Sequence, residues 1–419
     1  MFGLCDCNNF FASCERAFNP LLESKPVIVL SNNDGCVIAR SNEAKALGIK
    51  MGHPFFQITR LCDENSVNIF SSNSALYSDM SHRVISVLRE YVPEVEVYSI
   101  DEAFLDFTHT PIVGLSDLGT EIAATVKRST GIPVSVGIAP TKTLAKIASK
   151  LCKQYPKLRG SCLLSRPEDI EKVLHNFSIG DVWGIGRRFA KNLLSIGVVT
   201  AWDFTQMKRE RVRQIMGVAG LRVWEELRGT PCIDIECGYQ AKQQICVSRS
   251  FAGEIETFEE LRSSIVTFAS MCAAKLRSQK SVCSSISVFI YTNPFSKTDN
   301  QHYENRIVIL EQATDNTAVI AKEAVKALST IYKKGLRYKK GGVVLCDIYS
   351  KSHLQRSLFD TTDHERDTRL MKVVDSINLS NGANTVVLAS QGFSGIKTNH
   401  SYLSKRYTTD WNDIITVKV

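Results

Sequence analysis

The stretch Ser99-Ile-Asp-Glu-Ala-Phe-Leu-Asp106 decides the fold prediction. Strand-like runs flank its two adjacent acids, with VEVYSI at residues 95–100 before them and AFLDF after them, so we expect Asp101 and Glu102 at a β-hairpin. Asp6 ends another short strand, at residues 2–6. We expect that strand beside the hairpin, which would bring three carboxylates together. The alternative for an isolated Asp-Glu pair is an ordinary solvated turn.

Three carboxylates in one place would favour a bound cation. Crowded carboxylates repel one another, and a cation relieves that repulsion. Oxygen ligands of this kind suit Mg²⁺, which needs few protein ligands and keeps substrate phosphates in its shell. Two such ions about 4 Å apart can hold the attacking and leaving oxygens of phosphoryl transfer. The pattern is therefore typical of metal-dependent phosphoryl transfer.

The composition is that of an ordinary globular chain. The 419 residues are 44% hydrophobic and 22% charged, which allows two to four domains with buried cores. The net charge of +8 permits a nucleic-acid partner without requiring one. The 13 cysteines form no C-x-x-C pair, so we expect reduced thiols in a cytoplasmic protein. We expect neither a signal peptide nor a membrane span, because no apolar run reaches ~18–20 residues.

Residues 26–30 (PVIVL) and 134–138 (VSVGI) are predicted strands, and Thr141–Gln154 is a predicted amphipathic helix. Leu144 and Ile147 share its apolar face at helical spacing. The opposite face carries Lys142, Lys146, Lys150 and Lys153. A stripe of charges is usually a solvated face, and we expect this for Lys150 and partly for Lys142 and Lys146.

The second half of the chain changes character at Ser165. Residues 165–240 are expected to be mostly helical, beginning with a capping box at Ser165-Arg-Pro-Glu168. From Lys242 the pattern predicts a β-α-β-β-α-β unit of the ferredoxin-like kind. Its predicted elements are strand 243–251, helix 257–280, strand 283–291, strand 305–311, helix 315–333 and strand 342–349. After Ser350 the chain turns polar, and we expect a loosely packed tail.

Two segments carry a resemblance to a known family. The octapeptide S-I-D-E-A-F-L-D resembles the palm signature of the Y-family DNA polymerases, and L-C-D-C-N-N-F-F-A-S-C-E at residues 4–15 resembles their first metal-binding strand and the following helix. The resemblance implies a low-fidelity DNA polymerase that copies past damaged bases in the SOS response to DNA damage. It also implies that Asp6, Asp101 and Glu102 ligate two Mg²⁺ ions, with Asp6 and Asp101 bridging both.

The implied fold is an α+β, multidomain right hand with a ferredoxin-like palm and small fingers. It has a helical thumb with a helix-hairpin-helix and a β-α-β-β-α-β little finger. The expected divisions are residues 1–10 and 75–164 for the palm, 11–74 for the fingers, 165–240 for the thumb, 241–350 for the little finger and 351–419 for a regulatory tail.

The resemblance also assigns the nucleotide pocket. Phe11 occupies the position of the aromatic ring that blocks a ribose 2′-hydroxyl, so the enzyme would prefer dNTPs; the alternative is that Phe10 and Phe11 are both core residues. Lys45 and Lys153 occupy positions that reach the triphosphate. The family's tyrosine and arginine of the finger motif are here Asn42 and Lys45, and Lys45 offers a point charge without a bidentate fork.

Two segments are expected to hold DNA. Val182-Trp-Gly-Ile-Gly-Arg-Arg188 resembles a helix-hairpin-helix, in which Gly184 and Gly186 let the backbone approach a phosphate and Arg187 and Arg188 follow. The alternative is an ordinary connection between two helices. In the little finger, a run free of acidic residues includes Lys339 and Lys340, whose contacts should be to phosphate and sensitive to salt.

The tail contains Gln355-Arg-Ser-Leu-Phe359, which resembles a sliding-clamp-binding peptide. Leu358 and Phe359 would enter an apolar pocket on the clamp, guided by Gln355. This motif and the finger variant are typical of the UmuC-type branch of the family. That branch implies docking of UmuD′-like accessory subunits and of a RecA-type recombinase filament.

Two rival functions remain at this point. One is a palm-type nucleotidyl cyclase, which also uses two metal ions but would not need the glycine hairpin, the little finger or the clamp peptide. The other is a catalytically silent scaffold bound to DNA. The three carboxylates Asp6, Asp101 and Glu102 argue against a silent protein.

Overall fold

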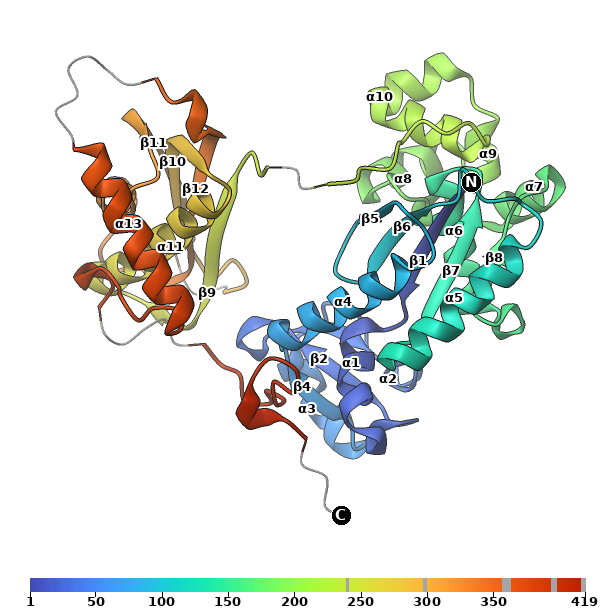
Figure 1. Ribbon diagram of the computed structural model, residues 1–419, viewed down its shortest axis with the longest axis horizontal. Helices are drawn as coiled ribbons and strands as arrows, with labels where there is room; N and C mark the ends of the chain where they lie inside the picture. The colour runs from blue at the N-terminus through green and yellow to red at the C-terminus, as the bar shows by residue number, and fades with distance from the viewer. Residues whose placement is uncertain (239–240, 297–299, 356–362, 393–397, 416–419) are drawn as a thin grey trace. The chain divides into compact units, whose positions relative to one another are not determined.

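The computed structural model describes residues 1–238, 241–296, 300–355, 363–392 and 398–415. The chain forms two compact units, Met1–Gly238 together with Ser401–Val419, and Tyr239–His400 (Figure 1). The end of the chain therefore packs with the N-terminal unit, although about 160 residues of the second unit separate them in sequence.

The first unit is built on a five-stranded sheet in the order β5-β6-β1-β7-β8. Strand β1 is central and antiparallel to both β6 and β7, while β7 and β8 are parallel. The strands are β1 (Phe2–Cys7), β5 (Val95–Val97), β6 (Glu102–Asp106), β7 (Val134–Ala139) and β8 (Ser161–Leu163). The predicted pairing of the first strand with the acidic hairpin is thus present.

Helices cover both faces of this sheet (Figure 1). The core that contains Cys5 and Leu105 also contains residues of α4 (Ser74–Leu88) and α5 (Leu115–Thr130). The core that contains Leu4 and Phe104 contains the apolar residues of α6 (Lys142–Gln154). Because successive side chains of a strand point to opposite faces, Asp6 and Glu102 lie on the α6 side, with Leu4 and Phe104.

A small three-stranded sheet follows β1, in the order β3-β2-β4. Strand β2 (Val27–Leu30) is buried along its whole length and lies between the other two strands, as its unbroken apolar sequence predicts. The remaining elements here are α1 (Phe10–Phe18), β3 (Val37–Arg40), α2 (Asn42–Ala46), α3 (Phe55–Glu64) and β4 (Asn68–Ser71).

A helical region follows β8 and shares one apolar core with α6. It contains α7 (Pro167–Asn176), α8 (Arg187–Ser195), α9 (Ala201–Thr205) and α10 (Arg209–Leu227). The predicted capping box at Ser165 is wrong, because the N-cap is Arg166 and no side chain caps the helix. Proline at the first helical position fits there since its missing N–H would have had no helical partner.

The second unit has the predicted β-α-β-β-α-β order. Its four-stranded antiparallel sheet runs β11-β10-β12-β9, so the last strand lies between the first two. Helices α11 and α12 pack on one face of it. The elements are β9 (Ile245–Ile255), α11 (Phe258–Ser278), β10 (Ser281–Thr292), β11 (Tyr303–Thr314), α12 (Thr317–Ile331) and β12 (Tyr338–Ser350).

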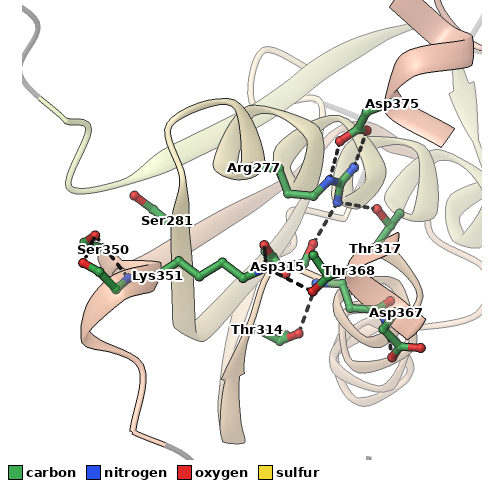
Figure 2. A network of polar contacts seen from close by, with 12 residues as sticks. Arg277, Ser281, Thr314, Asp315, Thr317, Ser350, Lys351, Asp367, Thr368 and Asp375 are labelled. Carbon is green, nitrogen blue, oxygen red and sulfur yellow. Dashed lines mark hydrogen bonds and ion pairs between the residues drawn. The ribbon is translucent and has the colours of Figure 1, made fainter. Parts of the chain in front are cut away.

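The expectation of a loosely packed tail is wrong for helix α13 (His364–Ser380). Figure 2 shows how Arg277 of α11 forms a two-pronged ion pair with Asp375 of α13 at 2.6 and 2.7 Å. Lys351 bonds Asp315 at 2.7 Å and Thr368 at 3.4 Å in the same network. The prediction failed because polarity alone does not distinguish a solvated coil from a helix that is held by ion pairs.

Within the described part of the chain, no helix is both long enough and apolar enough to cross a membrane. All 13 cysteines have free thiols, and most of them are buried among apolar side chains, where cysteine behaves as a small hydrophobic residue.

Candidate active site

Asp6 and Glu102 lie side by side on the neighbouring strands β1 and β6. They are direct partners in the antiparallel register of β1 and β6, and both lie on the α6 side. Lys153 of α6 places its Nζ 2.6 Å from Asp6 Oδ2, and Lys146 places its Nζ 2.8 Å from Glu102 Oε2. The two lysines are seven residues apart, which is two helical turns, so they meet two carboxylates in one row.

The environment of Asp6 is unfavourable for its charge. Burial raises the pKa of Asp6 from 3.8 to about 6, and the negative charges of Glu102 and Asp101 add to the rise, while Lys153 opposes it. Glu102 and Asp101 thus act on Asp6 as the sequence analysis expected of crowded carboxylates.

Asp101 occupies the turn before β6. The Ser99 hydroxyl donates to Asp101 Oδ1 at 2.6 Å and accepts from the amides of Asp101 and Glu102 at 3.2 and 3.0 Å. The Asp101 carbonyl accepts from the amide of Cys7 at 2.8 Å. These bonds fix the turn against the end of β1, next to Asp6. Ser99 is therefore a positioning residue that the sequence analysis did not single out.

The donor set suits a hard divalent cation, because it offers only carboxylate oxygens. In this structure, however, Lys153, Lys146 and Ser99 supply the partners of the three carboxylates. Among the described residues, no three His, Cys, Asp or Glu side chains are arranged as a ready metal cage. The three carboxylates fit a metal ion by charge and chemistry. The ammonium groups of Lys153 and Lys146 supply positive charge beside Asp6 and Glu102.

Lys146 is enclosed by aromatic rings. Its Nζ lies 4.3 Å from the ring centre of Tyr98 and 5.4 Å from that of Trp183. Trp183 Nε1 donates to the Tyr98 hydroxyl at 3.0 Å. Trp183 directly precedes Gly184. The segment that contains the glycine hairpin therefore contacts Lys146, the partner of Glu102. Sequence alone did not reveal this contact, because the three residues come from separate elements.

The remaining lysines of α6 are not a solvated stripe. Lys142 is 1% exposed and forms an ion pair with Glu96. It also donates to the carbonyl of Asp234 at 2.6 Å. Lys150 is half-buried and lies 2.9 Å from Asp181. The solvated-face interpretation is wrong for Lys142 and Lys146, because acids from other elements meet both ammonium groups.

A second basic group borders Asp6. Lys45 Nζ donates to Asn9 Oδ1 at 2.6 Å and to Asn42 Oδ1 at 3.2 Å. Burial lowers the pKa of Lys45, and the positive charges of Arg40 and Lys153 lower it further, while Asp6 opposes the change. Lys45, Lys153 and Arg40 are thus electrostatic neighbours. The sequence analysis missed Arg40, whose buried Nε has no hydrogen-bond partner in the part of the chain that the structure describes.

Phe11 is half-buried on α1, whereas Phe10 is a core residue with 3% exposure. The ring of Phe11 stacks on Tyr77 of α4, with centroids 4.4 Å apart and planes 13° apart. The two phenylalanines therefore have different environments, and only Phe11 is partly open.

The two hairpin glycines differ in what they require. Gly184 has φ +87°, and a Cβ there would lie 2.7 Å from Val223, so the fold itself demands glycine. Gly186 is the N-cap of α8 with φ −74°, and a Cβ there would meet nothing within 4 Å. Arg187 and Arg188 follow and are exposed. The surface at Gly186 is therefore open to an external group.

Other predicted contacts lie elsewhere. Lys339 and Lys340 belong to β12 of the second unit, where Lys340 Nζ lies 5.8 Å from the ring centre of Tyr291. Gln355 is exposed. Leu358 and Phe359 lie outside the described residues.

Comparison with known proteins identifies the family. Residues 5–150 match the impB/mucB/samB family, and residues 242–358 match the C-terminal domain of that family. The chain belongs to the impB/mucB/samB family. Residues 368–417 also match a domain of unknown function, DUF4113.

Individual relatives and a solved structure are similar over most of the chain. The chain is 42% identical to the protein UmuC of Salmonella typhimurium over the full length of both chains. It is 30% identical to a DNA polymerase IV of Desulfatibacillum aliphaticivorans, over 91% of this chain and 94% of that protein. A Y-family DNA polymerase chimera of Dbh and Dpo4 shares its fold, with a TM-score of 0.69 and 21% identity over 84% of this chain and all of the chimera. The predicted family and α+β fold class are confirmed.

Proposed function

We propose that this chain is a template-directed DNA polymerase of the Y family, which extends a primer past damaged bases by two-metal nucleotidyl transfer. The observation that carries the proposal is the arrangement of Asp6 opposite Glu102, with Asp101 fixed at the adjacent turn. The predicted enzyme class agrees with relatives that are named DNA polymerases. Neither the nucleotidyl cyclase nor the silent scaffold finds support among these relatives.

The proposed cofactor is Mg²⁺, held by Asp6, Asp101 and Glu102. When bound, two such ions would lower the pKa of the primer hydroxyl and stabilise the charge on the leaving pyrophosphate. The chain's own contribution is to present three carboxylates on one rigid hairpin and strand. Lys146 holds Glu102 in place through a charge-assisted hydrogen bond.

The proposed substrates are a dNTP and primer–template DNA. Lys45 and Lys153 would reach the triphosphate, and Arg40 adds a third positive charge beside them. Phe11 would block a ribose 2′-hydroxyl by its ring. Tyr77 supports that ring from behind.

The proposed division of labour follows the fold. Residues 1–10 and 75–164 would act as palm, 11–74 as fingers, 165–240 as thumb, 241–350 as little finger and 351–419 as regulatory tail. In the thumb, the backbone at Gly186 and the exposed Arg187 and Arg188 would bind a DNA phosphate, which positions DNA without reading its sequence. Lys339 and Lys340 would serve the same purpose in the little finger.

The proposed partners rest on family membership. UmuD′-like accessory subunits and a RecA-type filament fit the similarity to UmuC. A sliding clamp would bind Gln355, Leu358 and Phe359. Such a protein would act in the cytoplasm, as part of the SOS response.

Primer extension on intact and abasic templates tests the proposal. Purified protein, Mg²⁺ and dNTPs are assayed with and without clamp and accessory subunits. We expect short extension products that cross the abasic site. Asp101→Asn should abolish nucleotide addition and leave DNA affinity unchanged, because it removes a metal ligand and no DNA contact. Retained synthesis in the variant would refute the assignment of Asp101, and no synthesis by the wild type with its partners would refute the polymerase function.

A further inference from the structure

The end of the chain forms a strap across the first unit, defined here as residues 401–408. The amide of Ser71 on β4 donates to the Tyr402 carbonyl at 2.9 Å, and the Tyr402 amide donates back to Ser71 Oγ at 3.0 Å. The ring of Tyr407 stacks on Phe18 of α1, with centroids 4.9 Å apart and planes 8° apart. The strap is therefore held at both of its ends.

Between these anchors, Ser404 lies at the start of helix α4. Asn73, the N-cap of α4, donates from Nδ2 to Ser404 Oγ at 3.0 Å and to the carbonyls of Ser404 and Lys405 at 3.2 Å each. The Ser404 hydroxyl thereby accepts one bond, and its own proton is free to be donated elsewhere. It donates to Glu15 Oε1 at 2.9 Å.

Glu15 is an unusual group for this position. Its residue is 2% exposed, and no ion pair to it occurs among the described residues. Two neutral hydroxyls hold its carboxylate, Ser404 and Tyr77, whose OH lies 2.7 Å away. Burial raises the pKa of Glu15 to about 7 despite these bonds. A buried carboxylate is costly unless it is hydrogen-bonded, so the two hydroxyls matter to the fold.

Tyr77 connects this carboxylate to the predicted sugar gate. Its hydroxyl is fixed by Glu15, and its ring stacks on Phe11 at 4.4 Å. Phe11 and Glu15 are four residues apart on α1 and so share one side of that helix. Tyr77 itself is fully buried. A shift of the Phe11 ring toward α4 therefore meets the ring of Tyr77, whose hydroxyl is bonded to Glu15.

We propose that the strap positions the sugar gate, and that Ser404, Glu15 and Tyr77 are positioning residues that set the discrimination between dNTPs and rNTPs through Phe11. The proposal rests on the polymerase function and on Phe11 as the gate. It assigns a role in substrate selection to the C-terminal part of the chain, which falls within the domain of unknown function.

The chemistry of the contact favours positioning over simple stabilisation. An apolar side chain at position 15 would hold the strap by packing without a desolvation cost, whereas a carboxylate between two hydroxyls is directional. It fixes the position of the Tyr77 hydroxyl, and hence of the far end of the ring that stacks on Phe11.

The test compares five single variants and one double variant, all full-length, with the wild type in primer extension. Ser404→Ala and Tyr77→Phe each delete one of the two hydroxyls that donate to Glu15. Both variants keep the backbone, and Tyr77→Phe keeps the ring that stacks on Phe11. Ser404→Thr restores the hydroxyl. Ser401→Ala is the matched control, because Ser401 is exposed and contacts Asp34 through its backbone amide. The readout is the ratio of kcat/KM for an rNTP to that for the matching dNTP.

We expect Ser404→Ala and Tyr77→Phe to raise the ratio by about threefold to tenfold, the latter equal to about 1.4 kcal/mol. Ser404→Thr and Ser401→Ala should leave it at the wild-type value. Phe11→Ala should raise the ratio further. Adding Ser404→Ala to it should cause no additional rise, since Ser404, Glu15 and Tyr77 act through the ring of Phe11.

The outcomes separate this inference from the polymerase function. Normal dNTP incorporation with an unchanged ratio in both Ser404→Ala and Tyr77→Phe would overturn the positioning role and leave the polymerase intact. A fall in the rates for dNTP and rNTP by the same factor would also overturn it, because a purely structural strap would do that. A loss of melting temperature alone, without a change in the ratio, would count against it in the same way.

Discussion

Glu15 makes a stability prediction that can be worked out from the structure. Burial raises the pKa of its carboxyl from 4.5 to about 7, although Tyr77 and Ser404 donate bonds that oppose the rise. The folded state therefore holds more protons than the unfolded chain between these two pH values. The stabilisation is complete below about pH 4.5 and is lost as the pH rises through about 7. At about 1.4 kcal/mol for each pH unit in that interval, the loss is about 3 kcal/mol.

The perturbation is Glu15→Gln, which keeps the shape of the side chain and removes its titration. We expect the stability of the variant relative to the wild type to increase by about 2.5 kcal/mol between pH 5 and pH 8, because part of the total loss falls below pH 5. In a domain of 150–250 residues each kcal/mol moves the melting temperature by roughly 2–4 °C, so the difference in melting temperature should change by about 5–10 °C. Thermal unfolding followed by circular dichroism at several pH values measures it.

The control is Glu64→Gln, on the exposed face of α3, where the side chain is 56% exposed and pairs with Arg60. Its melting temperature relative to the wild type should show little dependence on pH, because an exposed ion pair contributes little. A pH-independent difference for Glu15→Gln would refute the reasoning, since it would mean that burial does not raise the pKa of this carboxyl.

Two further predictions concern DNA and the clamp. Gly184→Ala should destabilise the protein by about 1–2 kcal/mol, because the backbone of Gly184 is left-handed. Gly186→Ala should leave the melting temperature unchanged and weaken DNA binding in a fluorescence anisotropy titration. Equal DNA affinity for Gly186→Ala and the wild type would mean that no phosphate approaches that backbone. Replacing Leu358 and Phe359 together with alanine should abolish retention by an immobilised sliding clamp, with the Ser357→Ala variant as control. Undiminished retention would leave residues 355–359 as a plain linker.

Local sequence predicted several of the secondary-structure elements that surround the candidate active site. The short strand that ends at Asp6 was expected beside the acidic hairpin, and β1 does pair with β6. The periodicity of residues 141–154 predicts α6, and in the structure Thr141 is the N-cap of that helix. Glycine in the hairpin at Gly184 is likewise explained by its own backbone angle.

The local sequence pattern did not predict which groups the charged side chains would contact. Lys142 and Lys150 read alike in the sequence, yet Lys142 is buried against Glu96 and Lys150 is half-exposed beside Asp181. The difference depends on which element covers each turn of α6. The same holds for α13, where one bidentate pair from Arg277 to Asp375 orders a segment that its composition describes as polar.

The sequence by itself predicted the β-α-β-β-α-β order of the second unit and the strands on either side of Asp101 and Glu102, because strands and helices repeat every two and 3.6 residues. The resemblance to the Y family, and not periodicity, singled out the three carboxylates that carry the proposed chemistry. Only the tertiary structure decided that Lys153 meets Asp6 across 147 positions and that Ser404 meets Glu15 across 389. Hydrogen bonds act over about 3 Å, and the packing of distant elements alone determines which groups come that close.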